Sequence, residues 1–158
     1  MIGWWIAGGV VLLIAPFAYV ALRRMFRDIT TERALELFHL QREMLEAKFL
    51  ELGRSLDHPK GLVWADGDFE GEARFARHRR TGELVAFVDA TIYFALPESA
   101  PSDPQQPVGS RRQSTAIFLY KHGHWGTLGR SLFDMTPEEA LEQYRADYEP
   151  ILATEQHV

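Results

Sequence analysis

The sequence contains no cysteine, and this absence excludes several kinds of chemistry. A chain without thiols forms no disulfide bond, provides no thiolate ligand to a metal and has no cysteine nucleophile. An excess of positive charge is also lacking, because 17 Lys and Arg stand against 22 Asp and Glu, for a formal net charge of −5. Sequence-independent binding to nucleic acid requires a basic surface that displaces counterions from phosphate, so we expect no nucleic-acid partner.

The short motifs of phosphate, dinucleotide and zinc-protease sites are missing as well. No glycine-rich phosphate loop, no H-E-x-x-H and no G-x-G-x-x-G occurs in the chain. The closest histidine pair is His122 and His124, whereas a zinc site needs three or four protein ligands. We therefore expect neither a metal nor a cofactor.

The segment 66–77 begins like a calcium-binding loop but does not complete one. Its sixth position is Gly71, as such a loop requires, but the twelfth position holds Arg77 in place of a bidentate glutamate. The alternating carboxylates instead predict a strand with one solvated acidic face. The expected members of that face are Asp66, Asp68, Glu70 and Glu72. A weak divalent-cation site made of oxygen ligands remains the alternative.

No charged residue precedes Arg23, and residues 2–22 are almost entirely apolar. A helix of about 20 such residues rises about 30 Å, which matches the hydrocarbon core of a bilayer. Trp4 and Trp5 lie near one end of the run and Tyr19 near the other, where amphipathic rings favour the membrane interface. We predict a transmembrane anchor over residues 1–24. The alternatives are a cleaved signal peptide, which would carry basic residues before the run, and a buried helix of a soluble protein.

The charges that flank the run predict its orientation. Arg23, Arg24 and Arg27 follow it directly, and no basic residue precedes it. Basic residues favour the cytoplasmic side of a membrane, so we expect the N-terminus outside and the remaining chain in the cytoplasm. The predicted location is therefore a membrane that the chain crosses once.

Residues 25–58 are predicted to form a juxtamembrane amphipathic helix, because apolar side chains recur at helical spacing from about residue 29. The expected apolar face comprises Phe38, Leu45, Phe49, Leu52 and Leu56, widened by Leu37, Leu40 and Met44. Such a broad face is typical of a helix that packs on a sheet, and Arg42 interrupts the heptad pattern of a coiled coil. Packing on a sheet is the prediction, and self-association through this helix remains the alternative.

Residues 59–150 are predicted to form an antiparallel meander of four or five strands followed by a short helix. Strand signals lie at 72–79, 83–96, 114–121 and 124–133, with tight turns at Thr81-Gly82 and His122-Gly123. A proline-rich surface loop is expected over 97–110.

The short helix has the clearest local signature in the chain. Thr136-Pro137-Glu138-Glu139 supplies an N-cap hydroxyl, a proline at the first helical position and the glutamate of a capping box. The apolar face is expected to contain Ala140, Leu141, Tyr144 and Tyr148. Pro150 is expected to end the helix, leaving residues 151–158 as a tail.

These elements predict an α+β fold with both helices on one face of the sheet. The order of elements resembles that of cystatin-like and related folds, in which a curved antiparallel sheet wraps around a long helix. The resemblance implies an outline of the fold and no function.

Two groups of side chains are candidate sites. The basic group Arg77, Arg79 and Arg80 lies at a hairpin tip and could contact anionic headgroups or an acidic partner; the alternative is a solvated turn. Asp89 stands among apolar neighbours, and with Tyr93 and His124 it could provide the polar groups of a pocket. The alternative for Asp89 is a less buried sheet face and an ordinary hydrogen-bond partner.

The chain has a predicted anchor and a compact predicted domain, but no assembled chemistry. We expect a non-enzymatic, single-pass membrane protein whose cytoplasmic α+β domain binds other proteins, as an accessory or structural subunit of a membrane complex. The expected partners are the bilayer and either other subunits or further copies of the chain. The alternative is a membrane-tethered enzyme or small-ligand-binding protein with a pocket inside the curved sheet.

Overall fold

A computed structural model describes residues 3–56, 63–95 and 110–151 of the chain. Within the first of these ranges it describes the side chains of Tyr19 and of residues 30–56. The predicted loop, apart from Ser110, and residues 152–158 of the predicted tail lie outside the described residues. The chain divides into two compact units, Met1–Glu36 and Leu37–Val158.

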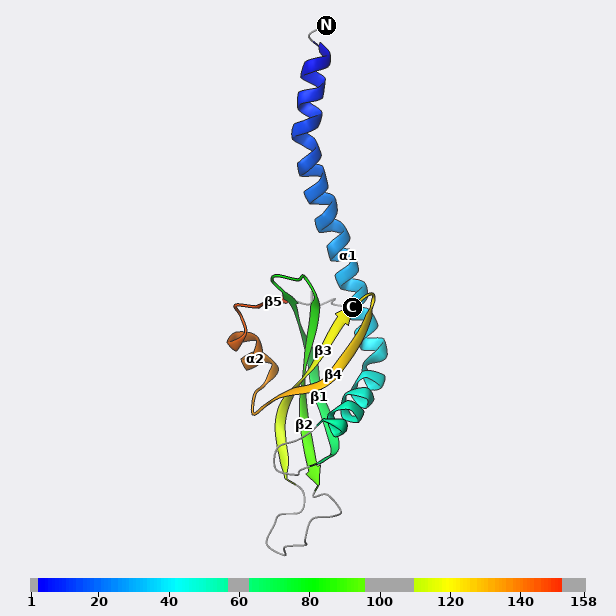
Figure 1. The fold of residues 1–158 in the computed structure, drawn as a ribbon, viewed down its shortest axis with the longest axis vertical. Helices are drawn as coiled ribbons and strands as arrows, with labels where there is room; N and C mark the ends of the chain where they lie inside the picture. The colour runs from blue at the N-terminus through cyan, green and yellow to red at the C-terminus, as the bar shows by residue number, and fades with distance from the viewer. Residues whose placement is uncertain (1–2, 57–62, 96–109, 152–158) are drawn as a thin grey trace, which may run out of the picture. The chain divides into compact units, whose positions relative to one another are not determined.

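The first element is a single helix, α1 (Gly3–Ser55). Its helical backbone continues through Arg23 and Arg24, so no break separates the predicted anchor from the predicted juxtamembrane helix. Within the second unit, the part of α1 from Leu37 onward lies along the sheet (Figure 1).

The sheet has five antiparallel strands in the order β4-β3-β2-β1-β5. The strands are β1 (Val63–His78), β2 (Leu84–Ala95), β3 (Arg111–Lys121), β4 (His124–Phe133) and β5 (Tyr148–Ile151). The first four form a meander, and β5 returns to pair with the end of β1. The predicted α+β class and the predicted antiparallel sheet are therefore confirmed.

Both predicted tight turns are present. His122 and Gly123 have φ angles of 52° and 85°, as a two-residue hairpin turn with two left-handed central residues requires. In the β1–β2 turn, the Gly82 N–H donates to the His78 carbonyl at 2.8 Å, and Gly82 has a φ of 74°. These local signals placed both hairpins correctly.

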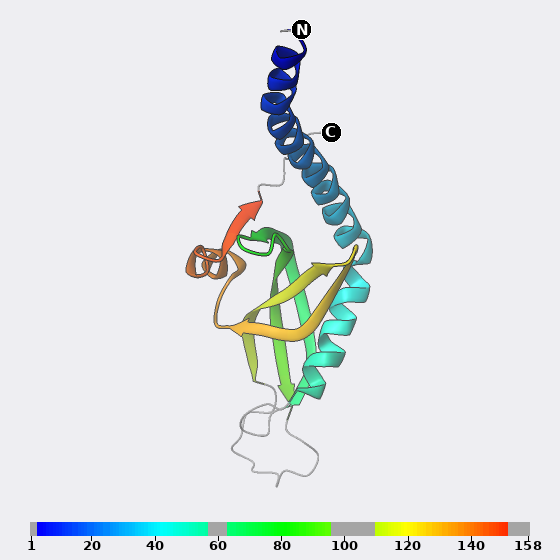
Figure 2. The same ribbon diagram turned by 45° about the horizontal axis from the view of Figure 1, so that its top comes forward.

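The two helices cover opposite faces of the sheet, so the prediction of both helices on one face is wrong. Phe75 points toward α1, where its ring lies 5.3 Å from that of Phe38. Its neighbour Ala76 points the other way and packs in a cluster with Ala140 of α2 (Pro137–Gln143). Figures 1 and 2 both show the sheet between α2 and residues 37–55 of α1. The physical reason is that the strands carry apolar side chains on both faces, and each face needs a cover.

The core beneath α1 is built from aromatic rings. The Phe38 ring centroid lies 5.5 Å from that of Phe118 and 5.0 Å from that of Trp125. About three turns further along the helix, the Phe49 ring centroid lies 5.4 Å from that of Trp64. All five side chains are buried. Rings of this size bury large apolar areas, and Trp64, Phe38, Phe49 and Phe118 are among the largest fully buried side chains of the domain.

The end of α1 meets β1 and β4 at two glycines. A Cβ on Gly53 would lie 2.2 Å from the Trp64 ring. A Cβ on Gly129, whose φ is +69°, would lie 2.7 Å from the backbone nitrogen of Gly53. Only glycine allows the backbones and the indole ring to come this close.

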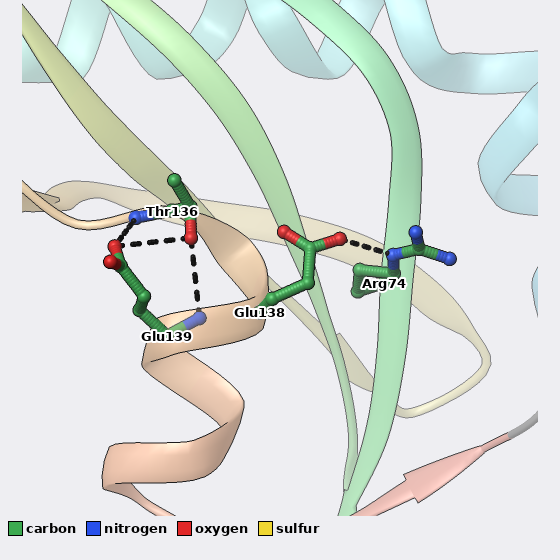
Figure 3. Close-up of polar contacts among 4 residues, drawn as sticks. All are labelled: Arg74, Thr136, Glu138 and Glu139. Carbon is green, nitrogen blue, oxygen red and sulfur yellow. Dashed lines mark hydrogen bonds and ion pairs between the residues drawn. The ribbon is translucent and has the colours of Figure 1, made fainter.

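The helix α2 begins with the predicted capping box. The Glu139 N–H donates to Thr136 Oγ1 at 3.3 Å, and the Thr136 N–H donates to Glu139 Oε2 at 2.8 Å (Figure 3). These two bonds satisfy backbone donors that the first turn of a helix leaves without partners.

The chain after α2 differs from the prediction. The helix ends at Gln143, and Tyr148 lies in β5 instead of on the helix face. Pro150 and Ile151 also belong to this strand, so neither the helix stop nor the start of the tail was placed correctly. Proline is tolerated in β5 because this is an edge strand, where an N–H facing solvent is not needed.

Candidate functional site

The acidic strand lies as the alternation predicts over its first half. Asp66, Asp68 and Glu70 are exposed on β1, whereas Phe69 turns toward α1, where its ring lies 5.7 Å from that of Phe49. Glu72 is also exposed but lies in a bulge, because β1 and β2 lose their regular register between Glu70 and Arg74. The carboxylates therefore occupy the sheet face opposite α1.

Two of the predicted pocket residues share this acidic face. Asp89 is half-buried opposite Glu70, and the Gln113 amide donates to it at 3.3 Å. The Tyr93 hydroxyl donates to Asp68 Oδ2 at 2.9 Å. This hydrogen bond to a carboxylate raises the pKa of Tyr93, because a phenolate would face the negative charge of Asp68. Both groups have ordinary hydrogen-bond partners on the sheet face opposite α1.

The third predicted pocket residue, His124, lies at a different place on the sheet. Asp89 pairs with Thr115 of β3, whereas His124 pairs with Lys121. Thr115 and Lys121 are six residues apart along one strand, which corresponds to roughly 20 Å. Asp89, Tyr93 and His124 therefore do not converge.

The described residues also contain no group of three or more His, Cys, Asp or Glu side chains that could hold a metal ion.

The basic group at the β1–β2 hairpin has structural roles. Arg77 Nη1 donates to the Gly82 carbonyl at 3.0 Å and so bridges the turn. Arg79 Nε donates to the carbonyl of Arg145, beyond α2, at 3.2 Å. The side chain of Arg80 is exposed. Two of the three guanidinium groups thus hold backbone segments together, which favours the structural interpretation of this tip.

A surface that the sequence interpretation missed lies on α1. Leu40 is 79% exposed and Met44 is 61% exposed, whereas Phe38 and Leu45 are buried. The prediction that Leu40 and Met44 widen the sheet-facing side is therefore wrong. An α-helix turns about 100° per residue, which places Leu40 about 200° around the axis from Phe38. The angle of each side chain around the helix axis, measured from Phe38, shows that Leu40 and Met44 face away from the sheet, whereas helical spacing alone does not.

These side chains belong to a short apolar row on the outer side of the helix. We call Leu37, Leu40, Met44 and Ala47 the outer stripe. Leu37 is half-buried at its edge, and Ala47 is exposed. Exposed Glu43 lies on one side of the outer stripe and exposed Lys48 on the other. An exposed apolar row with charged borders is typical of a protein-contact surface.

The predicted anchor falls mostly outside the described side chains. Those of Trp4, Trp5, Arg23, Arg24 and Arg27 are not described, and Tyr19 is exposed. In the described part of the chain, no helix has both the length and the hydropathy that a membrane span requires. The anchor remains a prediction from the sequence.

Comparison with protein-family models, with curated proteins and with solved structures gives no significant match. The resemblance to cystatin-like folds therefore remains one of element order.

Proposed function

We propose that the protein is a non-enzymatic, single-pass membrane protein with a cytoplasmic α+β domain that binds other proteins. In this proposal it serves as an accessory or structural subunit of a membrane protein complex. The N-terminus lies outside, residues 1–24 form the anchor, and the domain lies in the cytoplasm.

The support for the anchor comes from the sequence. Residues 2–22 carry no charged side chain, and Arg23, Arg24 and Arg27 follow them. An uncharged run of this length with basic residues on one flank is typical of a membrane-spanning helix whose basic end is cytoplasmic.

The support for a binding function, rather than an enzymatic one, is the placement of the polar groups. Asp89 and Tyr93 bond to neighbours on the sheet face opposite α1, and His124 lies elsewhere. The interior between α1 and the sheet is filled with aromatic side chains, whereas the outer stripe presents apolar side chains to solvent. A filled interior and an exposed apolar row favour a protein-contact role over a ligand pocket.

The anchor is tested first, by alkaline washing of membranes that contain the full chain. We expect the protein to stay with the membrane, and Leu13→Arg to release it, because a charged side chain at the centre of a span costs about 2.5–3.5 kcal/mol. Leu13→Ile is the matched control and is expected to stay. Release of the unmodified protein by the wash would refute the anchor.

The subunit role is tested by mild detergent extraction, size separation and identification of the proteins that travel with the chain. Co-migration with other membrane proteins at a fixed stoichiometry supports the proposal. Migration as a monomer or as a small homo-oligomer alone would refute the accessory-subunit role. It would favour the alternative of a membrane-tethered enzyme or small-ligand-binding protein.

A further inference from the structure

We propose that the outer stripe of α1 binds the same stripe of a second copy of the chain, with the two helices parallel and in register. This inference rests on the proposed anchor, because two chains held in one bilayer meet at a high effective concentration. It adds one partner to the proposed function, a second copy of the chain, and does not identify the other subunits of the complex.

The spacing of the outer stripe is that of a two-stranded coiled coil. Leu37, Leu40, Met44 and Ala47 follow one another at intervals of three, four and three residues, as positions a, d, a and d of a heptad do. The side that packs on the sheet is separate, because Phe38, Leu45 and Phe49 are buried there. The helix can therefore hold its own sheet and a second helix at the same time.

The charges beside the outer stripe favour a second copy in the parallel orientation. Glu43 occupies position g and Lys48 position e of the next heptad. In a parallel pair, a g residue lies beside the following e residue of the other helix. Glu43 would thus face Lys48 of the partner subunit, and by symmetry this ion pair would form twice. Both side chains are exposed in the single chain.

The antiparallel arrangement has a different charge pattern. It would bring the two Glu43 side chains together, and it would place Arg33 of one chain opposite Glu51 of the other, so local charge alone does not exclude it. In the parallel pair, Glu51 occupies the next a position and would face Glu51 of the partner subunit. The two like charges repel each other, so the contact ends there. The two Glu43–Lys48 ion pairs favour the parallel arrangement, and cross-linking at Ala47 decides between the two.

The contact is short, and the anchor compensates for its small size. The four residues of the outer stripe span less than two heptads, whereas an independent coiled coil needs three or four. Two anchored chains meet at a much higher effective concentration than two free ones. We therefore expect a dimer in the membrane at moderate surface density and weak association in dilute detergent.

The absence of cysteine allows a direct test. Full-length Leu40→Cys and Ala47→Cys are each reconstituted in lipid vesicles and oxidised with copper phenanthroline. In the parallel dimer both positions face their own copies, so both variants are expected to form disulfide-linked dimers. His39→Cys is the matched control, because it is exposed but lies about 100° around the helix from Leu40.

Ala47→Cys separates the two orientations. In an antiparallel pair centred between Leu40 and Met44, the two copies of residue 47 would lie about ten residues apart along the axis, or about 15 Å. Self-cross-linking at Ala47 above the His39 control therefore supports the parallel pair. Cross-linking of Leu37→Cys to Ala47→Cys in a mixture, without self-cross-linking at 47, would overturn it.

Charge reversal tests the ion pair. In the Ala47→Cys background, Glu43→Lys or Lys48→Glu alone places like charges together and is expected to weaken dimerisation about tenfold. The double variant restores opposite charges and is expected to restore dimerisation. The readout is the cross-linked fraction over a series of protein-to-lipid ratios. Failure of the double variant to recover would overturn the proposed pairing.

Failure of the dimer and failure of the anchor give different results. Retention in alkaline-washed membranes without cross-linking at Leu40 or Ala47 refutes the dimer and leaves the anchor intact. Release by the wash refutes the anchor and with it the parallel dimer. In native membranes, a cross-link from Leu40→Cys to a different protein in place of a second copy would assign the outer stripe to another subunit and would also overturn the inference.

Discussion

The two faces of the sheet carry different kinds of side chain. Beneath α1, aromatic rings from the helix and from β1, β3 and β4 contact one another, with Phe38 in contact with three strands. Beneath α2, the cluster consists of Ala76, Val85, Phe87 and Ala140, with Tyr148 and several aliphatic side chains packed against it, and carboxylates of β1 and β2 lie farther along that face. The α1 face thus buries most of the largest side chains, whereas the α2 face combines a small local core with exposed polar side chains.

The largest difference between the two faces is expected for truncation of central side chains. Phe38→Ala removes a fully buried ring from the α1 face and is expected to lower the free energy of unfolding by about 3–5 kcal/mol. Leu40→Ala, on the exposed side of the same helix, is expected to change it by less than about 0.5 kcal/mol.

Urea denaturation of the full chain in detergent, followed by tryptophan fluorescence, measures both variants. Tyr148→Ala provides the comparison from the α2 face, where the tyrosine is half-buried. A loss for Tyr148→Ala as large as that for Phe38→Ala would break the distinction between the faces.

The contact of α1 with β4 is expected to contribute more to stability than an exposed bulge of the same backbone geometry. Gly129→Ala is expected to destabilise by about 2–4 kcal/mol, because it combines a left-handed φ with a close approach to the backbone of Gly53. Gly71→Ala is the matched control, since its φ of +67° is similar but no atom lies within 4 Å of the added Cβ. We expect about 1–2 kcal/mol for Gly71→Ala by the same denaturation measurement. Equal losses would show that the close approach to α1 has no energetic weight.

On the α2 face, loss of the helix cap is expected to have a smaller effect. Thr136→Ala removes the acceptor of the Glu139 N–H and is expected to destabilise by about 1 kcal/mol. Thr136→Ser retains the hydroxyl and is expected to remain close to the parent protein. The two variants are compared by thermal unfolding. A loss for Thr136→Ala beyond that of Phe38→Ala would make α2 as important to the fold as α1.

The smallest expected effect is the pH dependence of the ion pair that joins α2 to β1. Arg74 Nε lies 2.7 Å from Glu138 Oε1, and this hydrogen bond lowers the pKa of Glu138 (Figure 3). A lowered pKa in the folded state stabilises the fold above the unfolded pKa, about 4.3, and the contribution is lost as the pH falls through the folded value. Both side chains are more than half exposed, so we expect only a few tenths of a kcal/mol.

This contribution is measured as the difference in unfolding free energy between the parent protein and Glu138→Gln at pH 7 and at pH 3. The difference is expected to be present at pH 7, to shrink at pH 3 and to be reduced in the Arg74→Gln background, where only the backbone hydrogen bond still lowers the pKa of Glu138. A difference that grows toward acid pH would contradict the assignment.

The features that the sequence predicts correctly depend on neighbouring residues. His122-Gly123 specifies its turn and Thr136 its capping box because the interacting groups are a few residues apart. The errors concern distant partners. Tyr148–Ile151 became a strand because β1 offers a free edge at Phe75–His78, which no local pattern reveals.

The candidate site illustrates the same limit. Leu40 and Met44 have helical spacing, but which side of α1 meets the sheet depends on the fit of Phe38 and Phe49 to rings on other strands. Asp89, Tyr93 and His124 were grouped by chemical type, and the strand register shows that type alone does not bring side chains together.

The pairing of β5 with β1 also has a consequence for the order in which the domain forms. Residues 75–78 of β1 are synthesised early, and their partners 148–151 come last among the described strands. If the meander folds before β5 docks, this part of β1 presents open backbone donors and acceptors to its surroundings. The sheet is therefore complete only when β5 pairs with β1, and a chain truncated before residue 148 would leave this edge of β1 open to pairing with another chain.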